Sequence, residues 1–321
     1  MRELTFSKAV YEAIREEMER DERVFVMGED IAWPGNKWRG LRDEFGENRA
    51  LNTPISESAM VGAGVGAALN GMRPIVDIMF ADLLPICHDH LSNDAAKISY
   101  QYGGEVSCPM VITASIGATG RGIGPHHSQS IESYFLNVAG LKVVMPSTPY
   151  DAKGLMKAAI RDDNPVIFLE HKRLRGMKDT VPEEEYIVPL GKADVKKEGN
   201  DVTIVATAYM LRLSLDAAKI LQKEGISCEV VDPRTLLPLD EDTIIDSVKK
   251  TSRLVIVQES PKAYGYGAEI AAIVAENALE FLDAPVKRVA NPGTPVPATA
   301  ILERAVIPSL NDIVKSVKEI I

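Results

Sequence analysis

Glu57 is the charged residue whose surroundings most favour chemistry. It is the only charged residue between Arg49 and Arg73, and small and apolar residues surround it in SESAMVGAGVGAALNG. Because the positive end of a helix dipole favours a carboxylate, an ordinary acid in the first turn of a helix is one explanation. The other is a buried carboxyl that shares a proton with a bound ligand. The residues around Glu57 leave both explanations open.

A pair of histidines, His126 and His127, closes a loop rich in glycine. The loop, GATGRGIGPHHSQS at 117–130, has four glycines before the pair and Ser-Gln-Ser after it. Glycine lets a ligand approach the backbone closely, and histidine is the side chain that most readily exchanges a proton near neutral pH. A turn whose histidines only hydrogen-bond to the backbone explains the spacing equally well, so this choice also stays open.

Two other patterns imitate binding sites but have the wrong spacing or context. His88 and His90 are two residues apart, so on a helix their imidazoles point in different directions, and no further ligands complete a tetrahedral metal site. The glycines of GAGVGA at 62–67 imitate a dinucleotide-binding fingerprint, yet they fall inside a helix predicted to begin at Pro54 with Thr53 as its cap. We expect these glycines to allow close approach of that helix to a neighbouring element or a cofactor rather than to bind NAD.

The elements that position these residues alternate between helix and strand. Apolar runs of strand length are separated by stretches with helical spacing, a pattern typical of parallel sheets covered by helices on both faces. In the first half, the sequence predicts helices at 6–20, 54–69, 83–100 and 150–161, and strands at 24–27, 74–79, 109–113, 142–145 and 166–169. In the second half, it predicts strands at 202–207, 227–231, 254–258 and 286–289, and helices at 211–223, 240–249, 268–280 and 310–320.

The segment 171–190 interrupts this alternation, because it has mixed charge, two prolines and no clear period. We therefore expect two domains in the chain of 321 residues, a number that fits the usual domain length. The predicted boundaries are a first domain at 1–175, a linker at 176–190 and a second domain at 191–321.

Composition and charge exclude several classes of protein. The chain has 36 Lys and Arg against 46 Asp and Glu, a net charge of −10 that disfavours a nucleic-acid binder. No stretch approaches the roughly 20 apolar residues of a membrane helix, and the charged N-terminal residues lack the apolar run of a signal peptide. The three cysteines include no close pair, so we expect free buried thiols and a cytoplasmic protein.

Eight motifs spread over the chain point to one family. They are GED at 28–30, TPISES at 53–58, HHSQS at 126–130, AGLKVVMPSTPYDAKGL at 139–155, AAIRDDNPVIFLEHK at 158–172, DPRTLLPLD at 232–240, YGAEIAA at 266–272 and DAPVKRV at 283–289. Through them the chain resembles the beta subunit of the thiamine-diphosphate-dependent first component of 2-oxo acid dehydrogenase complexes. This transketolase-like family includes the beta subunit of acetoin dehydrogenase. The resemblance implies an α/β fold of two three-layer domains, a pyrimidine-type thiamine-diphosphate-binding domain followed by a transketolase C-terminal-like domain.

The resemblance also assigns roles to residues of the motifs. It implies that Glu57 bonds the pyrimidine nitrogen N1′ of thiamine diphosphate, and that His127 faces the reacting centre, orients substrate and manages protons during acyl transfer. Ile55 and Met79 match positions that pack around the pyrimidine ring. Leu83 matches a further ring-packing position that is commonly aromatic in the family, so the usual stacking contact is absent here.

Family members also hold a structural potassium ion with backbone carbonyls. The matching positions in this chain are Val111, Ala159, Ile160, Asp162 and Asn164. Carbonyls at the end of a helix lack intrahelical partners and suit a hard cation, although water and neighbouring donors can fill the same place.

An absent motif points to a partner. Related single-chain enzymes carry GDG followed by a downstream asparagine to hold Mg²⁺ and the diphosphate, and this chain has no such GDG. The resemblance therefore implies a shared cofactor, with Mg²⁺ held mainly by an alpha subunit in an α2β2 tetramer that includes a beta–beta contact.

The activity implied is that of a beta subunit acting with its alpha subunit. The pair decarboxylates a 2-oxo acid (pyruvate or a branched-chain acid) or cleaves acetoin, and then transfers the acyl unit to the lipoamide of a partner acyltransferase. The sequence does not decide among these substrates. The alternative is a non-catalytic scaffold or regulatory subunit that retains the fold, and the presence of Glu57 and His127 disfavours it.

Overall fold

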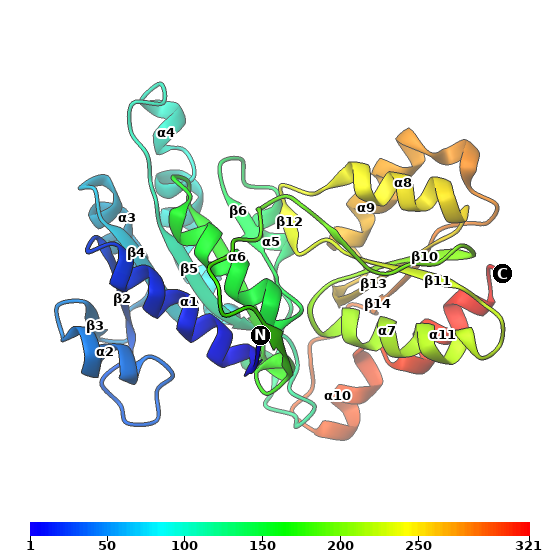
Figure 1. Ribbon diagram of the computed structural model, residues 1–321, viewed down its shortest axis with the longest axis horizontal. Helices are drawn as coiled ribbons and strands as arrows, with labels where there is room; N and C mark the ends of the chain where they lie inside the picture. Colours follow the sequence, from blue (N-terminus) through cyan, green and yellow to red (C-terminus); the bar gives the residue numbers. More distant parts are fainter. The chain divides into compact units, whose positions relative to one another are not determined.

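The computed structural model describes residues 1–321 and divides them into two compact units, in which each sheet is covered by helices (Figure 1). Unit 1 consists of Met1–Ile116, Tyr134–Glu170 and Leu174–Leu190, and unit 2 of Gly117–Ser133, His171–Arg173 and Gly191–Ile321. Two short segments of the first half thus belong to the second unit. One of them is the glycine-rich loop with the histidine pair.

Six neighbouring strands form the core of unit 1. In sheet order they are β6 (Lys142–Val144), β7 (Val166–His171), β5 (Val111–Ile116), β4 (Arg73–Phe80), β2 (Val24–Glu29) and β3 (Ala50–Thr53). The ladders β2–β3, β2–β4, β4–β5 and β6–β7 are parallel. Strands β2, β5 and β7 are buried along their whole length, which explains why they appear in the sequence as apolar runs.

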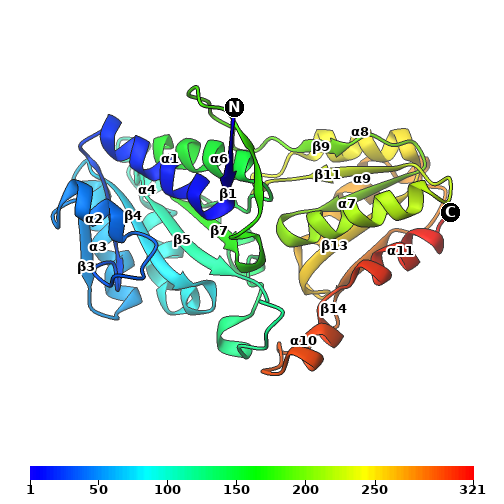
Figure 2. The same cartoon turned by 60° about the horizontal axis from the view of Figure 1, so that its bottom comes forward.

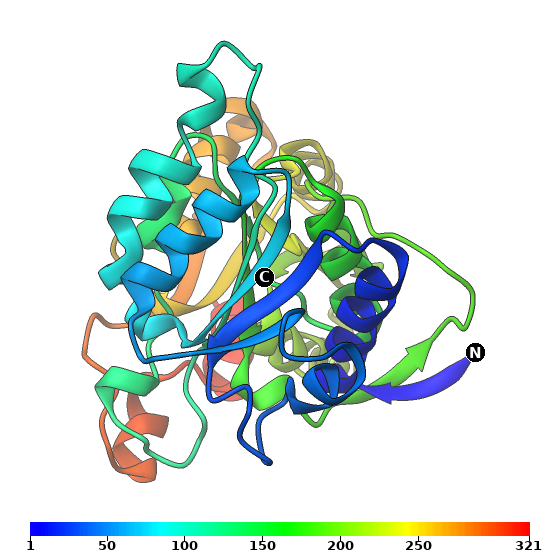
Figure 3. The same cartoon turned by 90° about the vertical axis from the view of Figure 1, so that its left-hand side faces the viewer.

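Helices cover both faces of this sheet (Figure 3). On one face, α1 (Phe6–Arg20) packs against α6 (Pro149–Arg161), and on the other, α3 (Glu57–Leu69) packs against β4. The buried carboxylate of Glu17 joins the first pair, because it accepts a hydrogen bond of 2.6 Å from Nη2 of Arg161. The α1 helix begins where the sequence predicts, with the Thr5 hydroxyl accepting from the Lys8 N–H at 3.3 Å.

The single helix predicted at 83–100 is wrong. The structure has a 3-10 segment at Ala81–Cys87, a π-helical turn at His90–Ala95 and the short helix α4 at Ile98–Gln101. Pro85 lies inside the first piece and cannot donate a backbone hydrogen bond, so a regular α-helix cannot run through it. In the second piece the Ala96 N–H bonds to the Leu91 carbonyl five residues back.

Strand structure also occurs in the segment 176–190, which the sequence predicts to be a linker. Its β8 (Lys178–Val181) pairs antiparallel with β1 (Arg2–Thr5) at the N-terminus. The segment belongs to unit 1. Neither strand has an apolar alternation that would have predicted it, because the pair is short and largely exposed. The remaining helices of the first half are α2 (Arg39–Phe45) and α5 (Ser133–Leu136).

Unit 2 is a five-stranded sheet with helices on both faces. Its strands are, in sheet order, β14 (Lys287–Asn291), β13 (Leu254–Pro261), β10 (Val202–Ala206), β11 (Cys228–Asp232) and β9 (Asp194–Lys197). Only β9 is antiparallel to its neighbour. The helices are α7 (Ala208–Gln222), α8 (Glu241–Thr251), α9 (Tyr266–Asn277), α10 (Ala300–Val306) and α11 (Leu310–Lys318), and β12 is Thr235–Leu237.

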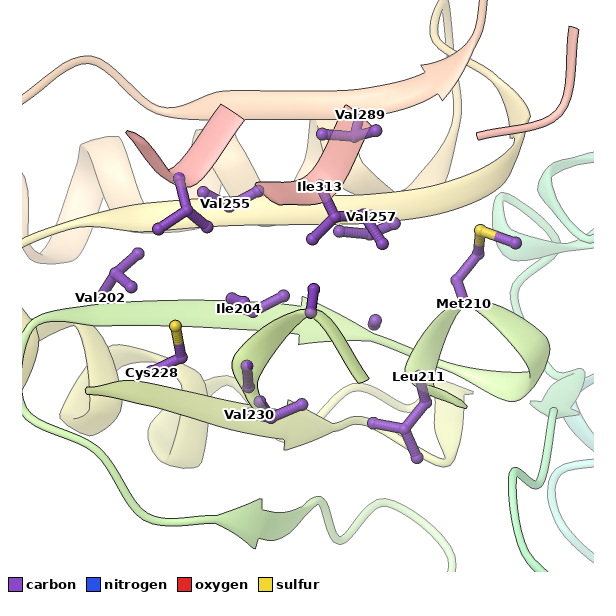
Figure 4. Close-up of a cluster of buried hydrophobic side chains, with 14 of the residues drawn as sticks. Val202, Ile204, Met210, Leu211, Cys228, Val230, Val255, Val257, Val289 and Ile313 are labelled. Carbon is purple, nitrogen blue, oxygen red and sulfur yellow. The ribbon is translucent and has the colours of Figure 1, made fainter. Parts of the chain in front are cut away.

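One core of unit 2 lies where α7 and α11 meet the sheet (Figure 4). Val202 and Ile204 of β10 and Val255 of β13 face Leu211 of α7 and Ile313 of α11, and all five side chains are fully or almost fully buried. The predicted strands and helices of this half are confirmed to within a few residues at their ends. Three elements were missed: β9, a partly exposed edge strand, β12, which has only three residues, and α10, whose pattern is short.

The predicted α/β class is confirmed, with parallel strands and alternating helices in both units. None of the helices is long and apolar enough to cross a membrane.

The glycines of α3 provide a test of close helix packing. A Cβ at Gly64 would lie 2.8 Å from Cγ2 of Val76 on β4 and 3.0 Å from Cε of Met110, whereas a Cβ at Gly66 would meet nothing within 4 Å. We expect Gly64→Ala to destabilise the chain by about 1–3 kcal/mol through overpacking. In contrast, Gly66→Ala should stabilise it by up to about 1 kcal/mol, because alanine favours a helix interior. Thermal unfolding of the isolated chain measures both, and equal shifts for the two variants would contradict close packing at Gly64.

Candidate active site

Glu57 is the first residue of α3. The predicted start at Pro54, with Thr53 as the cap, is wrong by three residues: Thr53 ends β3, and Ser56 occupies the cap position. The reason is strand pairing, because Thr53 lies opposite Glu29 in the β2–β3 ladder and must remain extended. The shift places Glu57 at the end of the helix where the dipole is positive.

The carboxylate of Glu57 has no protein partner. The residue is 9% exposed, and no hydrogen bond or salt bridge joins its side chain to another residue of the chain. Burying a carboxylate without a donor is costly, and buried polar groups are nearly always hydrogen-bonded. An ordinary first-turn acid would be expected in solvent, so the observed burial favours the explanation in which a ligand supplies the donor.

A second buried acid, Glu29, lies close to Glu57 at the end of β2. It is 6% exposed, and its Oε1 is buried with no hydrogen-bond partner. Burial, followed by the negative charges of Glu57, Asp30 and Asp77, raises the pKa of the Glu29 carboxyl above its ordinary value. Glu29 is not among the site residues that the sequence predicts. The available signal was an acid that ends the apolar run VFVMGE.

The positions predicted to pack around a ring lie at the same edge of the unit 1 sheet. Ile55 follows β3, Met79 is near the end of β4, and Leu83 comes three residues after that strand. Since β3, β2 and β4 are neighbouring parallel strands, their carboxyl ends and the residues that follow share one edge. Ile55 is 74% exposed and the other two are half-buried, so this edge presents apolar side chains beside two buried acids.

Met79 has a backbone conformation that L-residues seldom adopt. Its φ is 20°, at the point where the β4–β5 register shifts between Asp77 and Phe80. A non-glycine residue at positive φ costs about 1–3 kcal/mol, and such residues concentrate at functional sites. This irregularity in the β4–β5 pairing determines the direction in which the Met79 side chain leaves the strand.

The histidine pair belongs to unit 2. His126 and His127 end a 3-10 turn at Pro125–His127, with the His127 N–H bonded to the Gly124 carbonyl at 3.3 Å. His126 is exposed and His127 is half-buried. Glu57 lies in unit 1, so a joint role for Glu57 and His127 remains a prediction.

Side chains of the chain form no metal centre. No group of three or more His, Cys, Asp or Glu residues converges as metal ligands. His90 instead pairs with Asp94 at 2.7 Å, and the His88 ring packs against Phe135 at a centroid distance of 5.5 Å. All three cysteines are buried and free, and burial raises the pKa of each thiol, to about 12 for Cys87.

Arg73 occupies part of the predicted potassium site. Its Nη1 donates to the carbonyls of Ile160 and Asp162, each at 3.0 Å, and its Nη2 pairs with Asp163 at 2.5 Å. Two of the five predicted potassium ligands are therefore already bonded to a cationic side chain. A potassium ion at the same carbonyls would have to compete with the positive charge of Arg73.

Known proteins are similar to this chain along its whole length. Residues 2–177 match the pyrimidine-binding domain of transketolase, and residues 191–313 match its C-terminal domain. The chain is 47% identical to the 2-oxoisovalerate dehydrogenase subunit beta of Bacillus subtilis, over 91% of this chain and 90% of that one. It is 43% identical to the acetoin:2,6-dichlorophenolindophenol oxidoreductase subunit beta of the same organism (100% and 98%). It is also 45% identical to the pyruvate dehydrogenase E1 component subunit beta of Rickettsia felis (99% and 98%).

The chain belongs to the transketolase-like family of thiamine-diphosphate-dependent 2-oxo acid and acetoin dehydrogenase beta subunits. A solved structure titled as a split gene transketolase, inactive beta4 tetramer, has the same fold. It superposes with a TM-score of 0.82 at 23% identity, covering 99% of this chain and 98% of that one.

The residues at the edge of the unit 1 sheet fit the aminopyrimidine of the family's cofactor. An aminopyrimidine has apolar faces and a ring nitrogen that pairs with an acid. Glu57 is a buried carboxylate without a partner, and Ile55, Met79 and Leu83 supply apolar surface beside it. When bound, thiamine diphosphate would supply the carbanion and the electron sink that amino-acid side chains lack.

Proposed function

We propose that this chain is the beta subunit of a 2-oxo acid or acetoin dehydrogenase that transfers an acyl unit to lipoamide. The observation that carries the proposal is the buried, unpaired Glu57 at the family's cofactor-activating position, in a chain 43–47% identical to such subunits. A non-catalytic scaffold would have no need to retain a costly buried carboxylate, so that alternative is not favoured.

Glu57 holds the pyrimidine ring and moves one proton. With thiamine diphosphate bound, its carboxyl would bond the ring nitrogen and hold or release a proton at that atom, as a general acid–base group does. Ile55, Met79 and Leu83 pack on the ring and exclude water from that hydrogen bond. Because Leu83 is aliphatic, it offers dispersion contact without aromatic stacking. His127 orients the substrate and donates or accepts protons while the acyl unit passes to the lipoyl group.

The remaining parts of the active site come from partners. An alpha subunit holds the diphosphate and most of the Mg²⁺ ligands, and two copies of each subunit form an α2β2 tetramer with a beta–beta contact. A lipoyl-bearing acyltransferase accepts the product, and the complex works in the cytoplasm. The absence of a GDG motif supports this division, since this chain lacks the diphosphate-binding residues.

A structural potassium ion is also part of the proposal. It would use the carbonyls of Val111, Ala159, Ile160, Asp162 and Asn164. Its competitor is Arg73, which already donates to two of them.

Reconstitution with the alpha subunit tests the proposed function. We expect the pair, supplied with thiamine diphosphate and Mg²⁺, to turn over at least one of pyruvate, a branched-chain 2-oxo acid and acetoin, measured as reduction of an artificial electron acceptor. The isolated chain is the control and should show no turnover, because half of the cofactor site is missing. No turnover of any of the three substrates by the assembled pair would contradict the enzyme assignment.

A further inference from the structure

One buried carboxylate joins the two ends of the glycine-rich loop at 117–130. Oε1 of Glu259 on β13 accepts the Ala118 N–H at 2.6 Å and the Ser130 hydroxyl at 3.2 Å. A backbone bond between the Gly117 N–H and the Gln129 carbonyl, at 3.0 Å, lies beside them. The two ends of the loop that carries His127 therefore meet at a single acid, which is 5% exposed.

The second oxygen of Glu259 is engaged by His171. Oε2 lies 2.8 Å from Nε2 of His171, a residue only 1% exposed. The Arg173 N–H donates to Nδ1 of the same ring at 3.2 Å, so Nε2 carries a hydrogen and donates to Glu259. The His171 ring also stacks on Tyr209, with centroids 5.4 Å apart. Burial opposes ionisation of Glu259, but His171, Ala118 and Ser130 outweigh it and lower the pKa of this carboxyl.

Gly117 is required by this arrangement. Its φ is +83°, and a Cβ there would lie 2.2 Å from Nε2 of His171 and 2.8 Å from Oε1 of Glu259. No residue other than glycine fits without displacing both side chains. The backbone conformation of Gly117 and the packing against it are two independent indications. Both show that the ends of the loop 117–130 pack directly against the His171–Glu259 pair.

A second acid holds the middle of the loop. Oε2 of Glu303 on α10, a residue 1% exposed, accepts the Gly122 N–H at 3.0 Å. A Cβ at Gly122 would lie 2.5–2.7 Å from the backbone of Ala298, Thr299 and Ala300, so the loop lies directly against the start of α10 (Figure 2).

We propose that Glu259 is a positioning residue for acyl transfer, because it sets the geometry of the loop 117–130 and so the place of His127. The three hydrogen-bond partners of its carboxylate all come from the segments 117–133 and 171–173, which are 88 to 141 residues away in sequence. Its bonds therefore hold these segments, and none of them joins Glu259 to the body of unit 2. The catalytic consequence rests on the proposed function, in which His127 acts at the reacting centre.

Three variants separate this role from general stability. Glu259→Ala removes every bond to the loop. Glu259→Gln keeps the volume and one acceptor oxygen, but its amide N–H₂ then faces the N–H of His171. The matched control is Glu229→Gln, another buried acid of unit 2, which accepts the Gly199 N–H at 3.3 Å and pairs with Lys250.

Trypsin cleavage after Arg121 measures loop order without any catalysis. Arg121 is exposed in the loop. In the isolated full chain we expect cleavage there to be about tenfold faster in Glu259→Ala than in wild type, intermediate in Glu259→Gln and unchanged in Glu229→Gln, because cleavage follows local opening. If Glu259→Ala fails to fold, Glu259→Gln carries the test. Equal cleavage rates in wild type and the Glu259 variants would overturn the proposal.

Transfer kinetics in the assembled complex provide the second measurement. We expect Glu259→Ala to lower the rate of acyl transfer to the lipoyl domain about 10- to 100-fold, the usual cost of a misplaced catalytic group. Reduction of an artificial acceptor should fall less. If Glu259→Ala is cleaved faster by trypsin but transfers the acyl unit at the wild-type rate, the positioning role is overturned. The same holds if Glu229→Gln loses as much of the transfer rate as Glu259→Ala. If the wild-type complex has no turnover, the proposed function and the catalytic role of Glu259 both fail, and the cleavage rates decide separately whether Glu259 holds the loop.

Discussion

Glu57→Gln lowers turnover of the assembled enzyme by about 10²–10⁴-fold, the usual contribution of a general acid–base group. The amide can still form a hydrogen bond with the ring nitrogen, but it cannot share a proton with it. Deuterium exchange at the thiazolium C2 of bound cofactor should slow by a similar factor, since this exchange reports cofactor activation directly. The folded chain should not suffer, because Glu57 is largely buried and no hydrogen bond or salt bridge within the chain depends on its carboxylate. We therefore expect the thermal midpoint of the variant to stay the same or rise.

The matched control is Glu269→Gln, which alters another acid in the first turn of a helix. Glu269 lies in the first turn of α9 and is exposed. Its replacement should cost at most about 1 kcal/mol through the helix dipole and leave turnover unchanged. Were Glu57 only a first-turn acid, its variant would behave in the same way: a small loss of stability with near-normal turnover and exchange.

His127→Ala impairs acyl transfer to the lipoyl domain by about 10²-fold or more, within the range of a lost general acid–base group. The initial addition to the substrate carbonyl should be less affected, because the proposed function assigns that step to Glu57 and the cofactor. Rapid mixing with substrate alone measures the first step, and single-turnover acylation of the lipoyl domain measures the second.

The neighbouring histidine is the control for this prediction. His126 lies on the same 3-10 turn but is exposed, whereas His127 is half-buried. His126→Ala should therefore change neither step by more than about twofold, as expected for a surface substitution. If neither histidine variant affects either step, the HHSQS motif has a structural role only.

Local pattern was sufficient for most of the elements. The apolar runs that became β2, β5 and β7 are buried on both faces, so burial alone determines their composition, and no partner strand had to be known. Helices α1 and α6 likewise begin at caps that are visible in the sequence, Thr5 and Thr148, because capping involves residues only a few positions apart.

The errors occurred where distant parts of the chain compete with local preference. Pro54 is a good first residue for a helix, yet pairing of Thr53 with Glu29 keeps β3 extended and delays α3 to Glu57. The segment 83–100 has helical spacing, but Pro85 and the π turn at His90–Ala95 divide it. Strand β8 was missed because it forms only by pairing with the N-terminus, where Lys178 lies opposite Thr5, 178 − 5 = 173 residues earlier in the chain.

The α/β class, most element positions and the family follow from the order of amino acids alone, because apolar periodicity and contiguous motifs are local properties of the chain. The sequence also identified Glu57, the only charge in an apolar stretch. Three further facts become visible only in the folded chain: Glu57 is buried without a partner residue, Glu29 lies beside it, and Glu259 holds the loop of His127. Those facts depend on contacts between residues up to 141 positions apart, and no local pattern records such contacts.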